Sequence, residues 1–216
     1  MLRAIFFDSD GLLVDTEQMF FEETQAEFAT LGITLSAEQW ARWFLGEGKR
    51  SREIAQLLGA PEACLDQFIA SRNARFERRV DLGVPIFPGV PETLERLSAR
   101  FRLAIVTGAS RQHFARVHAA TGLLRYFELL VTSDDYDEAK HSPQAYLTAL
   151  ARIELSADEC FAVEDSPRGA VAARAAGLRC AVVPTPLTAI GLCPEGCEVV
   201  RDFSSLPELL TRMAPD

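Results

Sequence analysis

Polar and charged side chains lie at the ends of four short apolar runs of the sequence or in the loops that follow them. Their positions in chain order are Asp8 and Asp10, Thr107, Lys140, and Glu164 with Asp165. In open parallel sheets, ligands bind beyond the carboxyl ends of the strands. If the four runs are neighbouring parallel strands, these residues converge on one site.

Four carboxylates in one site repel one another unless a cation lies between them. At about 4 Å and an effective dielectric constant near 20, each pair costs roughly 4 kcal/mol. Oxygen ligands favour Mg²⁺, which binds one or two carboxylates, keeps some waters and shares a substrate phosphate. With the ammonium of Lys140 and the hydroxyl of Thr107, such a site neutralises a phosphoryl group while a carboxylate attacks it. These residue types therefore predict phosphoryl transfer.

The elements that must position these residues are visible as apolar runs separated by helix-like segments. Runs typical of buried strands are Leu2 to Phe7, Phe101 to Val106, Phe127 to Val131, Cys160 to Val163, Cys180 to Val183 and Glu198 to Val200. Helix patterns are Pro91 to Ser98, Pro143 to Ala151 and Gly169 to Ala176, the last ending at Gly177. Strands alternating with helices predict a parallel sheet covered on both faces.

The stretch from about Thr16 to Val80 contains no buried strand and has helical spacing throughout. We interpret it as a helical insertion after the first strand, with most of its aromatic side chains in the helix core. The predicted domains are therefore a core over 1–15 and 81–216 and an inserted helical domain over 16–80.

Composition excludes several classes of protein. The chain has 216 residues, 48% of them hydrophobic, and a net charge of −9, which disfavours nucleic acid and anionic membranes as partners. Five scattered cysteines favour reduced thiols over a disulfide framework. No run of about 18 apolar residues occurs, so export and membrane spanning are disfavoured. We expect a cytoplasmic protein, either a monomer or a homodimer, whose partner is a small phosphorylated metabolite.

The motifs resemble the haloacid dehalogenase superfamily, in its phosphatase and β-phosphoglucomutase-like branch with a small helical cap. The resemblance rests on Phe6-Phe7-Asp8-Ser9-Asp10-Gly11, Thr107-Gly108, Lys140 and Glu164-Asp165-Ser166 followed by Gly169 and Gly177. It covers nearly the whole chain. It implies an α/β fold, a Rossmann-like three-layer core with a parallel sheet plus an inserted helical cap domain. Thr16 and Val80 would then be the hinge strands of the cap.

The resemblance also implies roles for the four carboxylates. Asp8 is the nucleophile that forms an aspartyl-phosphate, and it also faces the metal. Asp10 carries protons to and from the reacting oxygens, and its main-chain carbonyl binds Mg²⁺. Asp165 ligates Mg²⁺ directly, and Glu164 supports the metal.

The phosphoryl group would be held by residues from three motifs. Thr107 and Lys140 bind phosphoryl oxygens, and Lys140 also screens the charge of Asp8. Main-chain amides around Gly11 and Gly108 complete the cradle.

The sequence departs from the family pattern around the lysine. The family usually has Gly-Lys-Pro-x-Pro-Asp, whereas this chain has Ala139-Lys140-His141-Ser142-Pro143-Gln144. Gln144 replaces a carboxylate that helps to order the loop, so we expect a less rigid Lys140. We interpret His141 as a partly solvated loop histidine, and His113 and His118 as structural or exposed.

Three cations are candidates for binding the rest of the substrate. Lys49 and Arg50, between the glycines of a helix-linking turn and the next helix, would bind a second anionic group, and Arg111 would bind a distal phosphate or carboxylate. The alternative for all three is a solvated surface charge.

The leading hypothesis is a Mg²⁺-dependent phosphatase that hydrolyses a sugar phosphate or a phosphoglycolate-like acid. The first alternative is a β-phosphoglucomutase-like mutase, but the histidine of the mutase pattern is replaced in the segment Met19-Phe20-Phe21. A dehalogenase is disfavoured by Asp10. The last alternative is a phospho-ligand-binding protein without catalysis.

Overall fold

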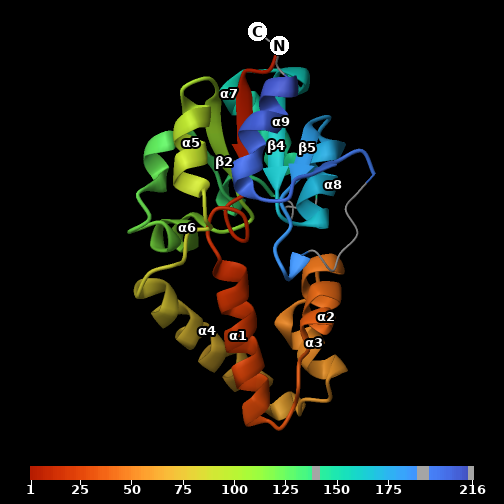
Figure 1. The fold of residues 1–216 in the computed structure, drawn as a ribbon. Coiled ribbons are helices and arrows are strands. Elements are labelled where there is room, and N and C mark those ends of the chain that lie inside the picture. The colour runs from red at the N-terminus through yellow and green to blue at the C-terminus, as the bar shows by residue number, and fades with distance from the viewer. Residues whose placement is uncertain (138–141, 189–194, 214–216) are drawn as a thin grey trace.

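In the computed structural model, residues 1–137, 142–188 and 195–213 are described, and six parallel strands form one sheet in the order β3-β2-β1-β4-β5-β6 (Figure 1). The strands are β1 Ala4–Phe7, β2 Arg102–Val106, β3 Leu129–Val131, β4 Cys160–Glu164, β5 Arg179–Val182 and β6 Glu198–Val199. β1 lies between β2 and β4, so the carboxyl ends of these strands meet at the centre of one edge. The predicted parallel sheet is confirmed.

Alternate residues of the central strands enter two different hydrophobic cores. Ile5 and Phe7 pack on one face, and Ala4 and Phe6 pack on the other. The first face is covered by α5 Val90–Ser98, α6 Arg111–Val117 and α9 Leu206–Met213. The second face is covered by α7 Gln144–Ile153 and α8 Pro167–Ala175. This arrangement is the expected three-layer α/β core.

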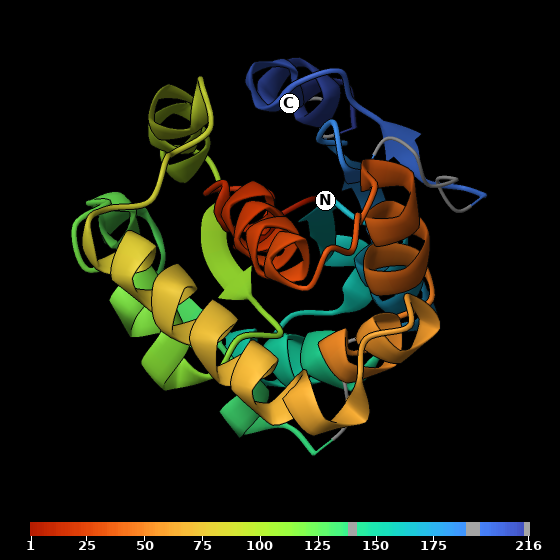
Figure 2. The same cartoon turned by 90° about the horizontal axis from the view of Figure 1, so that it is seen from below.

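A separate group of helices lies beyond the carboxyl ends of the strands (Figures 1 and 2). It consists of α1 Thr16–Thr30, α2 Ala37–Trp40, a π-helical segment Ala41–Gly46, α3 Ser51–Leu57 and α4 Leu65–Asp81. Phe21, Phe28 and Trp40 lie in a hydrophobic cluster of its own, as expected for helix-core aromatics. Phe20 and Phe44 differ from that expectation, because both also line a cavity beneath these helices.

The chain leaves and re-enters the sheet layer through two adjacent extended segments. Val14 forms an antiparallel bridge with Ile86, and the amide of Asp15 donates to the carbonyl of Pro85 at 2.9 Å. The expected hinge strands at Thr16 and Val80 are wrong, because both residues lie within helices, α1 and α4. The helices of the insertion run from Thr16 to Asp81, so the extended segments that cross between the layers lie outside both positions.

Within the described ranges, none of the helices combines the length and the apolar character needed to cross a membrane.

Candidate active site

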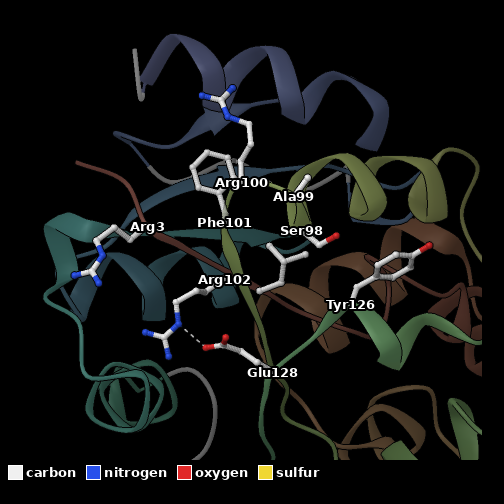
Figure 3. A pocket seen from close by; sticks show the side chains of 9 residues that line it. Arg3, Ser98, Ala99, Arg100, Phe101, Arg102, Tyr126 and Glu128 are labelled. Carbon is white, nitrogen blue, oxygen red and sulfur yellow. Dashed lines mark hydrogen bonds and ion pairs between the residues drawn. The ribbon is translucent and has the colours of Figure 1, made fainter. Parts of the chain in front are cut away.

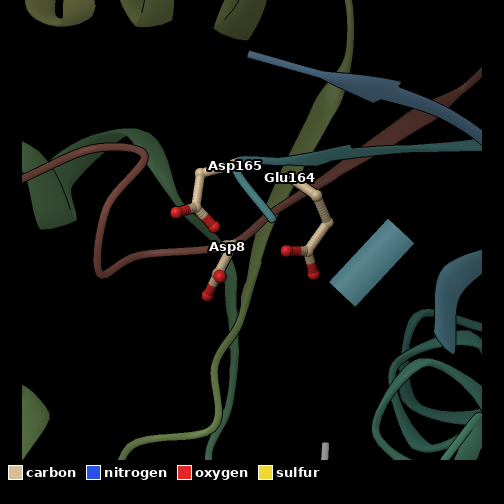
Figure 4. A group of neighbouring side chains, drawn as sticks. All are labelled: Asp8, Glu164 and Asp165. Atoms are coloured by element: carbon tan, nitrogen blue, oxygen red, sulfur yellow. The ribbon is translucent and has the colours of Figure 1, made fainter. Parts of the chain in front are cut away.

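Three carboxylates from two neighbouring strands meet at the centre of the sheet edge. Asp8 follows β1, Glu164 ends β4 and Asp165 comes next; all three are buried (Figure 4). One carboxylate oxygen from each lies within 4.8 Å of the others. Main-chain pairing fixes the geometry, because the amide of Asp8 donates to the carbonyl of Val163 at 3.0 Å. The predicted convergence of these strand ends is therefore observed.

Two glycines leave room for these carboxylates. A Cβ atom on Gly11 would lie 2.3 Å from Oδ2 of Asp165, and Gly11 also has a φ of +82°. A Cβ atom on Gly169 would lie 1.9 Å from Oε2 of Glu164. Both distances are far below a van der Waals contact, so only glycine fits at either position.

The carboxylate of Glu164 is also held from the next helix. The hydroxyl of Tyr146, in α7, donates a hydrogen bond to Oε1 of Glu164, and both side chains are fully buried. Burial and the charge of Glu164 raise the pKa of Tyr146 well above its ordinary value. The phenol therefore remains a hydrogen-bond donor to Glu164 at neutral pH. Sequence reasoning did not assign this residue to the site.

Asp10 is oriented by the first residue of the helical insertion. The hydroxyl of Thr16 donates to Oδ1 of Asp10 at 2.6 Å. Thr16 was expected only as a domain boundary, yet it begins α1 directly beneath the site. The side chain of Asp10 lines the same cavity as Asp8.

The loop between Asp8 and Asp10 is supported from below by a buried histidine. Nε2 of His118 lies 2.9 Å from Oγ of Ser9, and the amide of Ser9 donates to Oδ1 of Asp8 at 2.7 Å. Nδ1 of His118 lies 3.1 Å from Oγ1 of Thr121. Burial lowers the pKa of His118 to about 4, so its imidazole is neutral at physiological pH. The structural role expected for His118 is found, next to the segment from Asp8 to Asp10.

The end of β2 contributes the expected threonine. Thr107 is buried at the cavity floor, and its amide donates to the carbonyl of Val131 at 2.9 Å. Its Oγ1 accepts from the amide of Ala109 at 3.1 Å, and its carbonyl accepts from the hydroxyl of Tyr136 at 3.0 Å. The hydroxyl proton of Thr107 is therefore available for an acceptor in the cavity, beside Gly108.

Lys140 and His141 lie outside the described residues, so their predicted positions stay predictions. The residues on either side of that segment are joined by a hydrogen bond. Oε1 of Gln144 accepts from the amide of Asp137 at 3.1 Å. The glutamine amide thus supplies an acceptor where the family pattern has a carboxylate.

Asp8, Asp10, Thr107 and Asp165 line the floor of a cavity of about 730 Å³ between the sheet edge and the helices. Its upper walls are lined by aromatic side chains of the insertion, by polar groups from both layers and by two arginines. These walls include Glu17, Phe20, Phe44, Arg50, Asn73, Phe76, His113 and Arg168. His113, expected to be structural or exposed, lines this cavity and stacks on Phe76 with ring centroids 5.9 Å apart.

The structure places the three predicted substrate-binding cations in different surroundings. Arg50 lines the cavity. Lys49 and Arg111 do not, because each is held by an acidic neighbour: Lys49 pairs with Glu47 at 3.1 Å and Arg111 pairs with Asp135 at 2.8 Å. The assignment of these two residues to substrate binding is therefore not supported by their positions.

Glu17 is a titratable cavity residue that sequence reasoning did not assign to the site. Its Oε1 accepts from Nε1 of Trp40 at 3.0 Å. Burial raises the pKa of Glu17 to about 7, and the charge of Asp10 contributes in the same direction, whereas Trp40 and Arg168 act to lower it. The carboxyl is therefore close to half protonated at neutral pH.

A second cavity, of about 480 Å³, lies at the amino ends of the strands (Figure 3). Arg3 pairs with Glu159 at 2.9 Å and Arg102 pairs with Glu128 at 2.6 Å, so these charges are neutralised within the protein. This cavity lacks the carboxylate cluster of the opposite edge, and it is not the candidate active site.

Comparison with known proteins identifies the family to which this site belongs. A family model described as haloacid dehalogenase-like hydrolase matches residues 2–177. The chain belongs to the haloacid dehalogenase-like hydrolases. The resemblance inferred from the motifs is thus confirmed. The expected enzyme class, a phosphoric monoester hydrolase of this family, is confirmed by the same match together with the phosphatases among its relatives.

Relatives of this hydrolase cover most of its length. The CbbY protein of Rhodobacter capsulatus is 32% identical over 198 residues, which cover 87% of each chain. A phosphorylated carbohydrates phosphatase of Thermotoga maritima is 29% identical over 180 residues, which cover 82% of each chain. A crystal structure of a CbbY mutant from Rhodobacter sphaeroides in complex with xylulose-(1,5)-bisphosphate matches with a TM-score of 0.75. It is 25% identical, and the match covers 95% of this chain and 96% of that one.

Proposed function

We propose that this hydrolase is a Mg²⁺-dependent phosphatase that releases inorganic phosphate from a small phosphorylated carbohydrate through an aspartyl-phosphate on Asp8. The observation that carries the proposal is the buried cluster of Asp8, Glu164 and Asp165, of which Asp8 and Asp165 line a cavity large enough for a sugar phosphate.

The donor set fits Mg²⁺. Three buried carboxylates within 4.8 Å of one another need a compensating cation, and oxygen ligands of this kind suit a hard divalent ion. Asp8, Glu164 and Asp165 would hold it, with the main-chain carbonyl of Asp10 as a further ligand. When bound, the ion neutralises the negative charge shared by these carboxylates and the substrate phosphoryl group.

The reaction would proceed in two displacements at phosphorus. A carboxylate oxygen of Asp8 forms a bond to phosphorus while the bond to the leaving oxygen breaks, and Asp10 gives its proton to that oxygen. Asp10, now ionised, removes a proton from a water molecule that attacks the aspartyl-phosphate. The Asp8–phosphorus linkage then breaks and phosphate departs. The hydrogen bond from Thr16 supports this role by holding the carboxyl of Asp10 in one orientation.

The phosphoryl oxygens would be bound by the hydroxyl of Thr107, by the main-chain amides near Gly11 and Gly108, and by Lys140. Thr107 is well placed for this role because its hydroxyl oxygen already accepts a main-chain hydrogen bond and its proton is available. The ammonium of Lys140 would add positive charge next to Asp8.

The helices of residues 16–80 would act as a cap domain over the core of residues 1–15 and 81–216. They form the outer walls of the cavity, so substrate bound there is shielded from water during transfer. A carbohydrate substrate is favoured by the wall composition, which combines aromatic rings with the carboxyl of Glu17 and the amide of Asn73, both able to bind hydroxyl groups. The names of two relatives, which refer to phosphorylated carbohydrates and a sugar bisphosphate, support the same class.

Release of inorganic phosphate tests the proposal. Sugar phosphates, sugar bisphosphates and 2-phosphoglycolate are incubated with the enzyme, with Mg²⁺ or with a chelator, and Asp8→Asn serves as the control. We expect turnover that disappears without the metal and in the variant. Turnover that persists in Asp8→Asn contradicts the proposal. Isomerisation of a sugar phosphate that outpaces phosphate release would favour the mutase instead.

A further inference from the structure

Two arginines that line the cavity form no ion pair with any residue that the structure describes. Arg50 precedes α3 on the helical side, and Arg168 lies in the first turn of α8 on the sheet side. Among the residues that the structure describes, no ion pair involves either guanidinium, whereas the nearby cations Lys49 and Arg111 are both paired with carboxylates. An unpaired guanidinium in a ligand cavity is available to bind an anion.

Arg168 belongs to the core but reaches the loop of the helical insertion. A Cβ atom on Gly48 would lie 2.5 Å from Nη1 of Arg168. Gly48 also has a φ of +68°, so the loop passes close to the guanidinium in a conformation that favours glycine. The sheet-side arginine therefore lies against the loop that ends in Arg50, and both arginines line the same cavity.

The electrostatic influence of Arg168 extends into the cavity. Its charge acts on the carboxyl of Glu17, whose pKa it tends to lower. Asp8, Asp10 and Asp165 line the floor of the same cavity. The cavity thus has a floor suited to phosphoryl transfer and, separately, a pair of cations that the proposed chemistry does not use.

We propose that Arg168 and Arg50 bind a second anionic group of the substrate, so that the enzyme selects small molecules that carry a phosphomonoester together with a further phosphate or carboxylate. This inference rests on the proposed phosphatase function, and it assigns specificity to Arg168, a residue of the core. Two guanidinium groups bind such an anion through paired N–H donors, which a neutral alcohol at the same position cannot use.

Binding of substrates to a variant that cannot turn them over tests the inference apart from catalysis. Dissociation constants are measured by calorimetry for Asp8→Asn with fructose 6-phosphate, fructose 1,6-bisphosphate, ribulose 1,5-bisphosphate and 2-phosphoglycolate. We expect at least one ligand with a second anion to bind 10- to 100-fold more tightly than fructose 6-phosphate, with the gain lost in Asp8→Asn/Arg168→Gln. The bisphosphates and 2-phosphoglycolate distinguish a second phosphate from a carboxylate.

Kinetic measurements with two substrates separate an effect on substrate specificity from an effect on the chemical step. p-Nitrophenyl phosphate carries one anionic group, so Arg168→Gln is expected to change its kcat/KM less than threefold, while KM for the preferred two-anion substrate rises at least tenfold. Arg111→Gln is the matched control, because it removes the same charge at a residue outside the cavity, and it should leave both values unchanged.

Two results would overturn the assignment. One is equal binding of one-anion and two-anion ligands, and the other is an equal loss on both substrates in Arg168→Gln. Failure of the wild type to release phosphate from any of these phosphomonoesters contradicts the phosphatase instead, and the binding measurements still decide the second-anion site.

Discussion

The two walls of the active-site cavity are built in different ways. On the sheet side, Asp8 and Thr107 directly follow strands, and main-chain hydrogen bonds to Val163 and Val131 fix them at 3.0 and 2.9 Å. On the helical side, Arg50 lies at a loop end and Glu17 is held by a side-chain bond from Trp40. The difference indicates that strand geometry positions the proposed reacting groups, whereas the helical wall contributes side chains that can change without disturbing those groups.

The largest expected effect comes from a substitution on the sheet side alone. Asp10→Asn removes the proton carrier, so kcat for p-nitrophenyl phosphate should fall by about 10²–10⁴-fold with little change in KM. Asp15→Asn is the control, since asparagine retains the capping role of Asp15 at the start of α1. An equal loss in both variants would show that the segment, and not the proton carrier, is responsible.

Glu17 tests the helical side through the pH dependence of stability. Burial raises its pKa from 4.5 to about 7, so the unfolded chain ionises at lower pH than the folded one. Stability contributed by the protonated form is complete below pH 4.5 and is lost as pH rises towards 7 and above. Between pH 5 and 8 the wild type should lose about 2–3 kcal/mol more than Glu17→Gln, measured by urea unfolding. If the free energies of unfolding of the wild type and of Glu17→Gln changed in parallel with pH, a buried carboxyl at Glu17 would be excluded.

His118, on the sheet side, gives stability the opposite dependence on pH. Its pKa is lowered from 6.5 to about 4, so the unfolded chain takes up a proton before the folded one. Stability is therefore retained above pH 6.5 and lost as pH falls towards 4. From pH 7.5 to 5 the wild type should lose about 2 kcal/mol more than His118→Leu in the same assay. An unchanged slope in the variant would contradict a neutral, buried imidazole.

The smallest expected effect lies at the junction between the walls. Thr16→Val removes the hydrogen bond to Asp10, which is worth about 1 kcal/mol, so kcat should fall by roughly five- to tenfold. Thr30→Val, at the far end of the same helix and exposed, is the control. Full activity in Thr16→Val would mean that Asp10 is oriented without the helical insertion.

The sequence predicted the sheet side well for a physical reason. Buried parallel strands must be apolar along their length, so the polar residues Asp8, Thr107 and Glu164 mark where strands end. Parallel topology then brings those ends together. The family resemblance adds roles that strand patterns do not contain.

The cations that bind substrate and the side chains that support the site were less predictable, because both depend on contacts between residues distant in the sequence. Nothing local distinguishes Arg111, which pairs with Asp135, from Arg168, which has no ion pair among the described residues. The supports supplied by Thr16, Tyr146 and His118 likewise depend on partners that lie next to them only in the fold. The position of Lys140 remains a prediction from the sequence.

The central claim is that Asp8 at the sheet edge is the nucleophile, whatever substrate the helices select. Rapid acid quenching during turnover, followed by peptide mass spectrometry, tests it directly. The account predicts one added phosphoryl group on the peptide that contains Asp8 in the wild type, and none in Asp8→Asn. Substrate turnover without that adduct, or an adduct that persists in the variant, would contradict it.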